Sequence, residues 1–226
     1  MKYHVSFDID FRRNPYKGRY IAVEGIDGSG KSTQAEKLKE YFEEKRKKVL
    51  LTHEPTRKPP IGDLIHNVIQ GNIKLPASSF QYLFAADREV HSKTTIEPFL
   101  EQGKIIITDR CFWSSVAYGI LDKSDKLNGS EILLVAQSIL SMYHQFIIPD
   151  FTFYIKISEE AAVKRLAKMD KKQEYYETLE KLKKIKEGYD WLAKKFSNEI
   201  ITINGEQSVE KVTADIIKIY DLRFKN

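Results

Sequence analysis

The sequence predicts an α/β fold: a five-stranded, mostly parallel sheet with helices on both faces. Three observations predict it. Short apolar, β-branched runs alternate along the chain with longer segments of helical periodicity. A glycine-rich turn joins the first of these strands to the first helix. Polar or charged residues follow the strands where they end. Because parallel strands need crossover connections, the alternation favours a sheet buried between two helical layers.

The expected elements follow in chain order. The strands are residues 20–24, 48–52, 104–108, 151–157 and 199–203, and the helices are residues 32–45, 61–70, 76–102, 114–120, 131–146, a segment after Ser158, 179–196, and a segment after Ser208. Ser158 and Ser208 are expected N-caps, because a serine hydroxyl accepts hydrogen bonds from the free amides of a first turn. Pro98 predicts a kink or a split in its helix.

The turn between the first core strand and the first helix carries the pattern G-x-x-x-x-G-K-S from Gly25 to Ser32. Glycines let successive N–H groups point at one phosphate, and the following helix N-terminus adds partial positive charge. Lys31 supplies a full charge to the outer phosphates, and Ser32 supplies a hydroxyl for Mg²⁺. The sequence therefore predicts a three-layer P-loop NTPase fold over residues 19–226, with the phosphates of a nucleotide bound at the loop by Gly25, Asp27, Gly28, Ser29, Gly30, Lys31, Ser32 and Thr33.

Residues 1–18 precede this fold as a separate N-terminal extension. Tyr3, Val5, Phe7, Ile9 and Phe11 alternate with polar residues, and this period of two predicts an extra strand.

The carboxyl ends of the expected strands gather other candidates for chemistry. Asp109 ends an apolar strand, where a carboxylate can hold Mg²⁺ together with Ser32. Arg110 follows it and can bind phosphates through two N–H groups. By itself, the pair could equally be a structural Asp–Arg contact at the sheet edge.

Phe84 and Arg88 lie four residues apart, so they share one face of the helix at 76–102. An aromatic ring and a guanidinium one turn apart can hold a base and its polar edge. A core phenylalanine and an arginine that pairs with a surface acid have the same spacing, and by pattern alone we favour that interpretation. Arg57, after the second strand, offers charge for a phosphate.

The chain is lysine-rich from Lys164 to Lys195. Leu179, Leu182, Ile185, Tyr189, Leu192 and Phe196 recur every three or four residues, which predicts a core-facing stripe and a solvated lysine face. Arg165, Lys168, Lys171 and Lys172 lie near a break in helical pattern, and we expect residues 166–176 to form a lid over ATP.

Composition excludes several classes of protein. The chain is 42% hydrophobic and 31% charged, and it contains no apolar run near the roughly 18 residues of a membrane span. A charged N-terminus and the single Cys111 predict a cytoplasmic protein without a membrane partner. The net charge of +5 suits nucleotides as well as nucleic acids, and we expect no nucleic-acid partner.

With these residues in view, the chain resembles the thymidylate kinases over about residues 19–222. Four blocks carry the resemblance: Glu24 to Thr33, His53-Glu54-Pro55-Thr56-Arg57, Tyr82 to Arg88 with His91, and Asp109 to Tyr118. The resemblance implies transfer of the ATP γ-phosphoryl group to dTMP, giving dTDP, with Mg²⁺ near Ser32 and Asp109 and a homodimer built on the helix at 76–102.

The resemblance also implies the role of each site residue. It implies catalysis by Lys31, Arg110, Asp27, Lys171 and Lys172; acceptor binding by Asp27, Glu54, Arg57, Phe84, Arg88, Arg110, Ser115 and Tyr118; and ATP binding by the P-loop with Arg165, Asn204, Gly205 and Glu206. The chain departs from the family pattern in Gly28, where some members carry arginine, in Cys111-Phe112-Trp113, and in residues 1–18.

Three other functions agree with the same residues. One is a related deoxynucleotide or deoxynucleoside kinase with dUMP, dGMP or thymidine as acceptor. Another is a P-loop switch or nucleic-acid-associated ATPase, which the sequence pI of 9.0 suggests. A third is a nucleotide-binding protein without kinase activity, because lysines stand where a lid arginine is expected.

Overall fold

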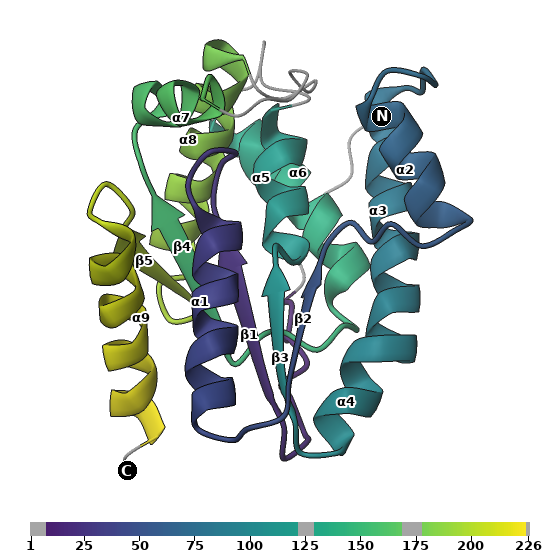
Figure 1. The fold of residues 1–226 in the computed structure, drawn as a ribbon. Helices are drawn as coiled ribbons and strands as arrows, with labels where there is room; N and C mark the ends of the chain where they lie inside the picture. The colour runs from purple at the N-terminus through teal and green to yellow at the C-terminus, as the bar shows by residue number, and fades with distance from the viewer. Residues whose placement is uncertain (1–7, 122–128, 169–177, 225–226) are drawn as a thin grey trace.

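A computed structural model of the chain describes residues 8–121, 129–168 and 178–224. Its centre is a five-stranded parallel sheet in the order β2-β3-β1-β4-β5 (Figure 1). The strands are β1 (Arg19–Glu24), β2 (Val49–His53), β3 (Ile105–Asp109), β4 (Phe151–Lys156) and β5 (Ile200–Asn204). The predicted fold class is therefore confirmed. All five carboxyl ends point to the same edge of the sheet.

Helices cover both faces of this sheet (Figure 1). They are α1 (Lys31–Glu44), α2 (Ile61–Ile69), α3 (Ala77–His91), a π-helical turn (Ser92–Ile96), α4 (Glu97–Glu101), α5 (Phe112–Leu121), α6 (Gly129–Tyr143), α7 (Glu159–Leu166), α8 (Leu179–Lys195) and α9 (Val209–Phe224). Each expected helix is present, with boundaries shifted by a few residues.

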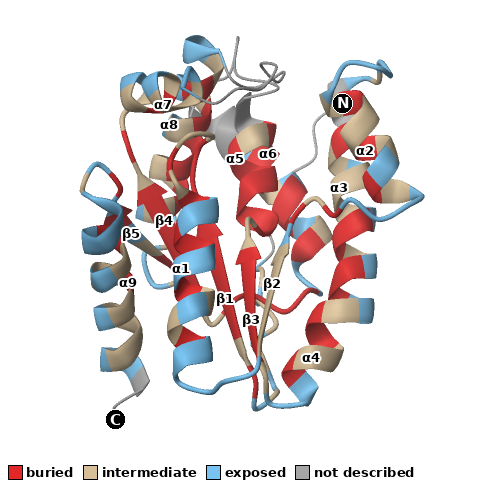
Figure 2. Ribbon diagram, in the orientation of Figure 1, coloured by how far each residue is buried: buried red, intermediate tan, exposed pale blue. Residues whose placement is uncertain are grey.

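Alternation along β1 explains the two layers. Ile21 and Val23 pack with α1 and α9 on one face, whereas Ala22 packs with α5, α6 and α8 on the other. Successive strand side chains point to opposite faces, so an apolar strand buries both. Figure 2 shows the sheet as a buried layer between helices whose outer faces are exposed.

Local signals in the sequence set several boundaries. Ser158 and Ser208 cap α7 and α9 as predicted, accepting from the amides of Ala161 and Lys211. The helix predicted at 76–102 is interrupted by the π-helical turn before Pro98, which confirms the predicted irregularity. The stripe predicted on α8 is buried except at its ends: Leu179 is 50% exposed, so its assignment to the core is wrong. Leu179 is the first residue of α8, so it lies at the very end of the packed stripe.

The N-terminal segment lies against the domain from residue 8 onward. Phe11 joins an aromatic cluster with Phe112, Trp113 and Phe196, at ring-centroid distances of 5.6–6.0 Å. Arg12 makes a single parallel bridge to Ile147 and an ion pair with Glu97. Beyond this bridge residues 8–18 form no strand, and the rest of the extra strand predicted here, residues 1–7, lies outside the described residues. The lid predicted at residues 166–176, with Lys171 and Lys172, also falls largely outside them.

In the described parts of the chain, every helix is too short or too polar to cross a bilayer.

Candidate active site

The P-loop leads from the end of β1 into α1. Gly28 and Gly30 take left-handed φ angles of 80° and 92°, which side chains other than glycine rarely adopt, so the loop curls tightly around its own amides. Lys31, the first residue of α1, is folded back into the loop and is only 9% exposed at its side chain. Ser32 donates a hydrogen bond to the Asp109 carboxylate, so the two predicted metal ligands are in contact.

Asp27 is the centre of the charges around the loop. Its carboxylate accepts from Lys31 Nζ at 3.1 Å, from an Arg110 guanidinium nitrogen at 2.5 Å and from the Tyr118 hydroxyl at 3.1 Å. Burial by itself would raise the pKa of Asp27, but the Arg110 and Lys31 charges outweigh burial and hold that pKa well below its ordinary value. Asp27 therefore stays ionised and holds the two cations in place before any phosphate is present.

Arg110 has an uncommon backbone conformation, and several hydrogen bonds hold its guanidinium group in place. Its φ of 74° is left-handed, which is uncommon for a residue with a side chain. Its NH1 donates to Gly25 O at 3.1 Å and to the Ser114 and Tyr189 hydroxyls at 3.2 Å. Burial would lower the pKa of Arg110, yet neighbouring Tyr118 and Asp27 raise it well above its ordinary value. The guanidinium is a positive charge held in a fixed position beside Asp27.

Sequence reasoning missed the group that supports Arg110. Glu24, at the end of β1, accepts from the amides of Cys111 and Ser114 at 2.8 and 3.1 Å, and from the Ser114 and Tyr189 hydroxyls at 2.7 and 2.8 Å. These bonds anchor the turn that carries Arg110 and the start of α5. Glu24 lies in the block from Glu24 to Thr33, but Tyr189 is 165 residues away, and no local signal connects them.

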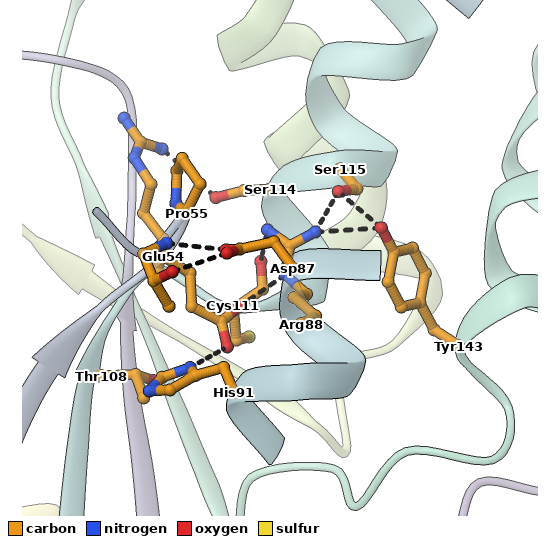
Figure 3. Close-up of polar contacts among 12 residues, drawn as sticks. Glu54, Pro55, Asp87, Arg88, His91, Thr108, Cys111, Ser114, Ser115 and Tyr143 are labelled. Atoms are coloured by element: carbon orange, nitrogen blue, oxygen red, sulfur yellow. Dashed lines mark hydrogen bonds and ion pairs between the residues drawn. The ribbon is translucent and has the colours of Figure 1, made fainter. Parts of the chain in front are cut away.

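Arg88 lies in a second buried network, shown in Figure 3. Its Nε donates to Glu54 at 2.5 Å, and its NH2 donates to the Cys111 carbonyl at 3.1 Å. Its NH1 donates to the Ser115 and Tyr143 hydroxyls. Burial would raise the pKa of Glu54, but Arg88 and His91 lower it below its ordinary value. The alternative in which Arg88 pairs with a surface acid is wrong, since Arg88 is 4% exposed and its partner Glu54 is also buried.

Two cavities adjoin each other beside Asp27, Glu54 and Arg110. One, of about 130 Å³, is lined by Phe84, Arg88, Ser114, Ser115 and Tyr118, and we call it the aromatic cavity. The other, of about 280 Å³, is lined by Lys31, Ser32, Arg57 and Asp109, and we call it the phosphate cavity. Asp27, Glu54, Pro55, Ile69 and Arg110 line both. A cavity of about 150 Å³ binds benzene in other proteins, so the aromatic cavity is of a size to receive a planar ring.

Arg165 and Gly205, two of the remaining predicted ATP-binding residues, lie beside the P-loop. Arg165 donates to Ser29 O at 3.1 Å and to Gly205 O at 2.9 Å, and so joins the loop to the turn after β5. Glu206 instead accepts from Ser158, and with Asn204 it lines a separate hollow outside both cavities. Thr33 is exposed in the first turn of α1.

The chemistry of the phosphate cavity fits Mg²⁺. Asp109 Oδ1 is buried and, within the described residues, has no hydrogen-bond partner. No cluster of three or more His, Cys, Asp or Glu side chains forms in the described parts of the chain. Mg²⁺ is usually held by one or two carboxylates with waters and substrate phosphates, so a single unsatisfied carboxylate oxygen beside Ser32 suits it.

Comparison with known proteins decides which P-loop family this is. The sequence profile of the thymidylate kinases matches residues 23–216. The chain belongs to the thymidylate kinase family. A probable thymidylate kinase of Pyrococcus horikoshii is 35% identical over 208 residues, covering 90% of this chain and 96% of that protein. One of Methanosarcina barkeri is 36% identical over 204 residues, covering 89% and 95%.

A solved structure agrees with this assignment. The thymidylate kinase of Candida albicans, whose structure was reported to reveal the origin of its broad substrate specificity, is similar with a TM-score of 0.76 and 26% identity, covering 91% of this chain and 92% of that one. As a member of the thymidylate kinase family, the chain is a phosphotransferase with a nucleotide-binding P-loop.

Proposed function

We propose that the protein transfers the γ-phosphoryl group of ATP to the 5′-phosphate of dTMP, giving dTDP and ADP. The observation that carries this proposal is the meeting of two cavities at Asp27 and Arg110. One offers an aromatic face and a guanidinium, which suit a base, and the other offers Lys31 and the P-loop, which suit phosphates. Two nucleotides bound there would meet at their phosphates.

Phosphoryl transfer needs positioning and charge neutralisation more than covalent help. Phe84 would stack on the base, and Arg88 would donate to its edge. Arg110 and Arg57 would bind the acceptor phosphate, and Lys31 with the loop amides would bind ATP. When bound by Ser32 and Asp109, Mg²⁺ supplies further neutralisation of the ATP phosphates. The acceptor phosphate is already ionised, so the reaction needs no general base.

Lys31 and Arg110 share the carboxylate of Asp27 in the free protein. Phosphates arriving in the two cavities would compete with Asp27 for these cations. Asp27 would then be available for the sugar 3′-hydroxyl of the acceptor, and the cations would neutralise charge on the transferred group.

The test is Arg110→Ala, measured as dTDP formation from ATP and dTMP. We expect kcat to fall roughly 10²–10³-fold, because a charge aimed at the transferred group is removed. A variant within about threefold of wild type, equivalent to ~0.65 kcal/mol, would contradict the assignment. Exposed Lys195→Ala, at the end of α8, serves as the control and should keep wild-type turnover.

A panel of acceptors separates this function from its alternatives. Product formation is measured with dTMP, dUMP, dGMP, dCMP and thymidine. Preference for thymidine would assign a nucleoside kinase, and ATP loss without any acceptor would assign an ATPase.

We further propose a cytoplasmic homodimer that uses the outer face of α3. Tyr82 and Val90 on this helix are 71% and 50% exposed, so the outer face of α3 offers apolar area to a partner. The buried free thiol of Cys111 suits a reducing compartment. Sedimentation of wild type and Tyr82→Glu tests the dimer, which the added charges should dissociate.

A further inference from the structure

Tyr143 of α6 has no role in the mechanism above, although its side chain is fully buried and its hydroxyl contacts two residues that line the aromatic cavity. Arg88 NH1 lies 3.0 Å from the Tyr143 oxygen, and that oxygen lies 3.1 Å from Ser115 Oγ. Figure 3 shows Tyr143 and Ser115 together at one end of the Arg88 guanidinium, with Glu54 at the other.

The direction of each hydrogen bond follows from chemistry. A guanidinium has five N–H donors and no acceptor, so Arg88 must donate to the Tyr143 oxygen. In the structure the Tyr143 hydroxyl donates its one hydrogen to Ser115 Oγ. Arg88 NH1 also donates to Ser115 Oγ. A serine hydroxyl has two acceptor lone pairs and one hydrogen, so both Ser115 lone pairs are engaged.

The Ser115 hydrogen is left for a ligand. Within the described residues, Ser115 Oγ has contacts only with Arg88 and Tyr143, both of which donate to it. Ser115 lines the aromatic cavity, so its remaining hydrogen is available to a group bound there.

Arg88, which also lines the aromatic cavity, has a second donor that its neighbours do not use. Of its five N–H groups, Nε donates to Glu54, two on NH1 donate to Ser115 and Tyr143, and one on NH2 donates to Cys111 O. The other NH2 hydrogen has no partner within the described residues. The nearest carboxylate, Glu54, is already paired with the cavity's own residues, because one oxygen accepts from Arg88 and the other lies 2.9 Å from His91 Nδ1.

We propose that Tyr143 is a positioning residue for base selection: by donating to Ser115, it makes the Ser115 hydroxyl a donor into the aromatic cavity, which then accepts a pyrimidine with a keto group at C4. A cytosine ring would point its 4-amino hydrogens at the Ser115 and Arg88 donors, and buried donors facing donors are strongly unfavourable. This inference rests on the proposed function and assigns the residue that sets its acceptor base.

The test is Tyr143→Phe, which removes the hydroxyl and keeps the ring. Ser115 then regains a lone pair that can accept from an amino group. We expect the ratio of kcat/KM for dTMP over dCMP to fall at least tenfold. The ratio for dTMP over dUMP should stay within twofold, because both bases carry the 4-keto group. An unchanged dTMP-over-dCMP ratio would overturn the proposal.

The matched control is Tyr154→Phe. Tyr154 is also a buried tyrosine, 1% exposed, but its hydroxyl donates to Asp190 at 3.2 Å, and it lines neither cavity. Both ratios should remain at wild-type values. A fall in the Tyr154→Phe ratio equal to that of Tyr143→Phe would assign the effect to loss of packing and overturn the proposal.

If Tyr143→Phe does not fold, Ser115→Ala tests the proposed donor role of the Ser115 hydroxyl. This variant removes the outward donor and keeps the bond from Arg88 to Tyr143, so the dTMP-over-dCMP ratio should fall. Where both variants fold, adding Tyr143→Phe to Ser115→Ala should lower the ratio no further. A ratio unchanged by Ser115→Ala, or a further fall in the double variant, would overturn the proposal.

Binding separates this inference from the proposed function. The affinities of thymidine and deoxycytidine are measured by calorimetry, which needs no phosphoryl transfer. A wild type that prefers thymidine through Tyr143 but does not phosphorylate dTMP would support the inference and refute the function. If the protein phosphorylates dTMP but wild type and every variant bind the two nucleosides with equal affinity, the proposed function is supported and the inference is refuted.

Discussion

Two carboxylates, Asp27 and Glu54, hold the guanidinium groups of the site. Asp27 pairs with Arg110, and Glu54 pairs with Arg88. In each case burial by itself would raise the carboxyl pKa, and the paired cations reverse that effect. Both carboxylates therefore stay ionised at neutral pH, and each arginine is oriented before a nucleotide binds.

Glu54→Gln tests the buried pair. The glutamine amide would keep the shape of the side chain but remove its charge, leaving buried Arg88 without its counter-charge. We expect the free energy of unfolding at pH 7 to fall by about 3 kcal/mol, measured by urea denaturation. Loss of less than about 0.5 kcal/mol would contradict the role given to this pair.

The stabilisation that the charge of Glu54 contributes depends on pH in a direction that can be predicted. The pKa of Glu54 is lower in the folded protein than in the unfolded chain, where it is about 4.3. Its stabilisation is therefore present above about pH 4.3 and is lost as the pH falls through the lowered folded pKa. The difference in the free energy of unfolding between wild type and Glu54→Gln should therefore become smaller only in that acidic range.

At the scale of elements, the close packing of α8 on α5 connects the end of the chain to the site. Gly188 makes it possible, since a Cβ there would lie 2.9 Å from the Ala117 carbonyl. The next residue, Tyr189, then reaches Glu24 and Ser114, which support the turn carrying Arg110. Helix packing thus fixes the position of a residue that we expect to bind substrate.

Gly188→Ala should separate the two helices. We expect a destabilisation of about 1–3 kcal/mol, because the added methyl group is forced into a filled space. Gly188→Ala should also lower kcat, because Tyr189 moves away from Glu24. This fall should be larger than in a variant that loses the same stability through a substitution elsewhere in the protein. Leu38→Ala in α1, packed on the other face of the sheet, provides that comparison. Equal kcat in the two variants would refute the connection from α8 to Arg110.

At the scale of the whole molecule, one edge of the sheet collects the P-loop, Asp109 and Arg110 from different strands. These groups come together only in the folded protein, so a ligand that binds to them should stabilise the folded state. We expect dTMP at 100 times its dissociation constant to raise the free energy of unfolding by about 2.7 kcal/mol, measured by thermal denaturation. The same concentration of dCMP should raise it less, and equal shifts would count against the base selection proposed here.

Much of the fold could be predicted because its signals are local. The P-loop lies in one stretch from Gly25 to Ser32, and strands, caps and the break before Pro98 follow from neighbouring residues. Parallel topology then brings strand ends together, so contact between Ser32 and Asp109 could be foreseen.

Only the tertiary structure decided how the side chains of the site are held. Tyr189 is 165 residues from Glu24, and Tyr143 is 55 residues from Arg88. Their hydroxyls reach the site because α8 and α6 pack on α5, and packing depends on the shapes of whole helices. A tyrosine with helical spacing has the same pattern whether it fills the core or orients an arginine. The sequence alone thus determined which chemical groups reach the edge of the sheet, whereas long-range packing determined their orientation and hydrogen-bond direction.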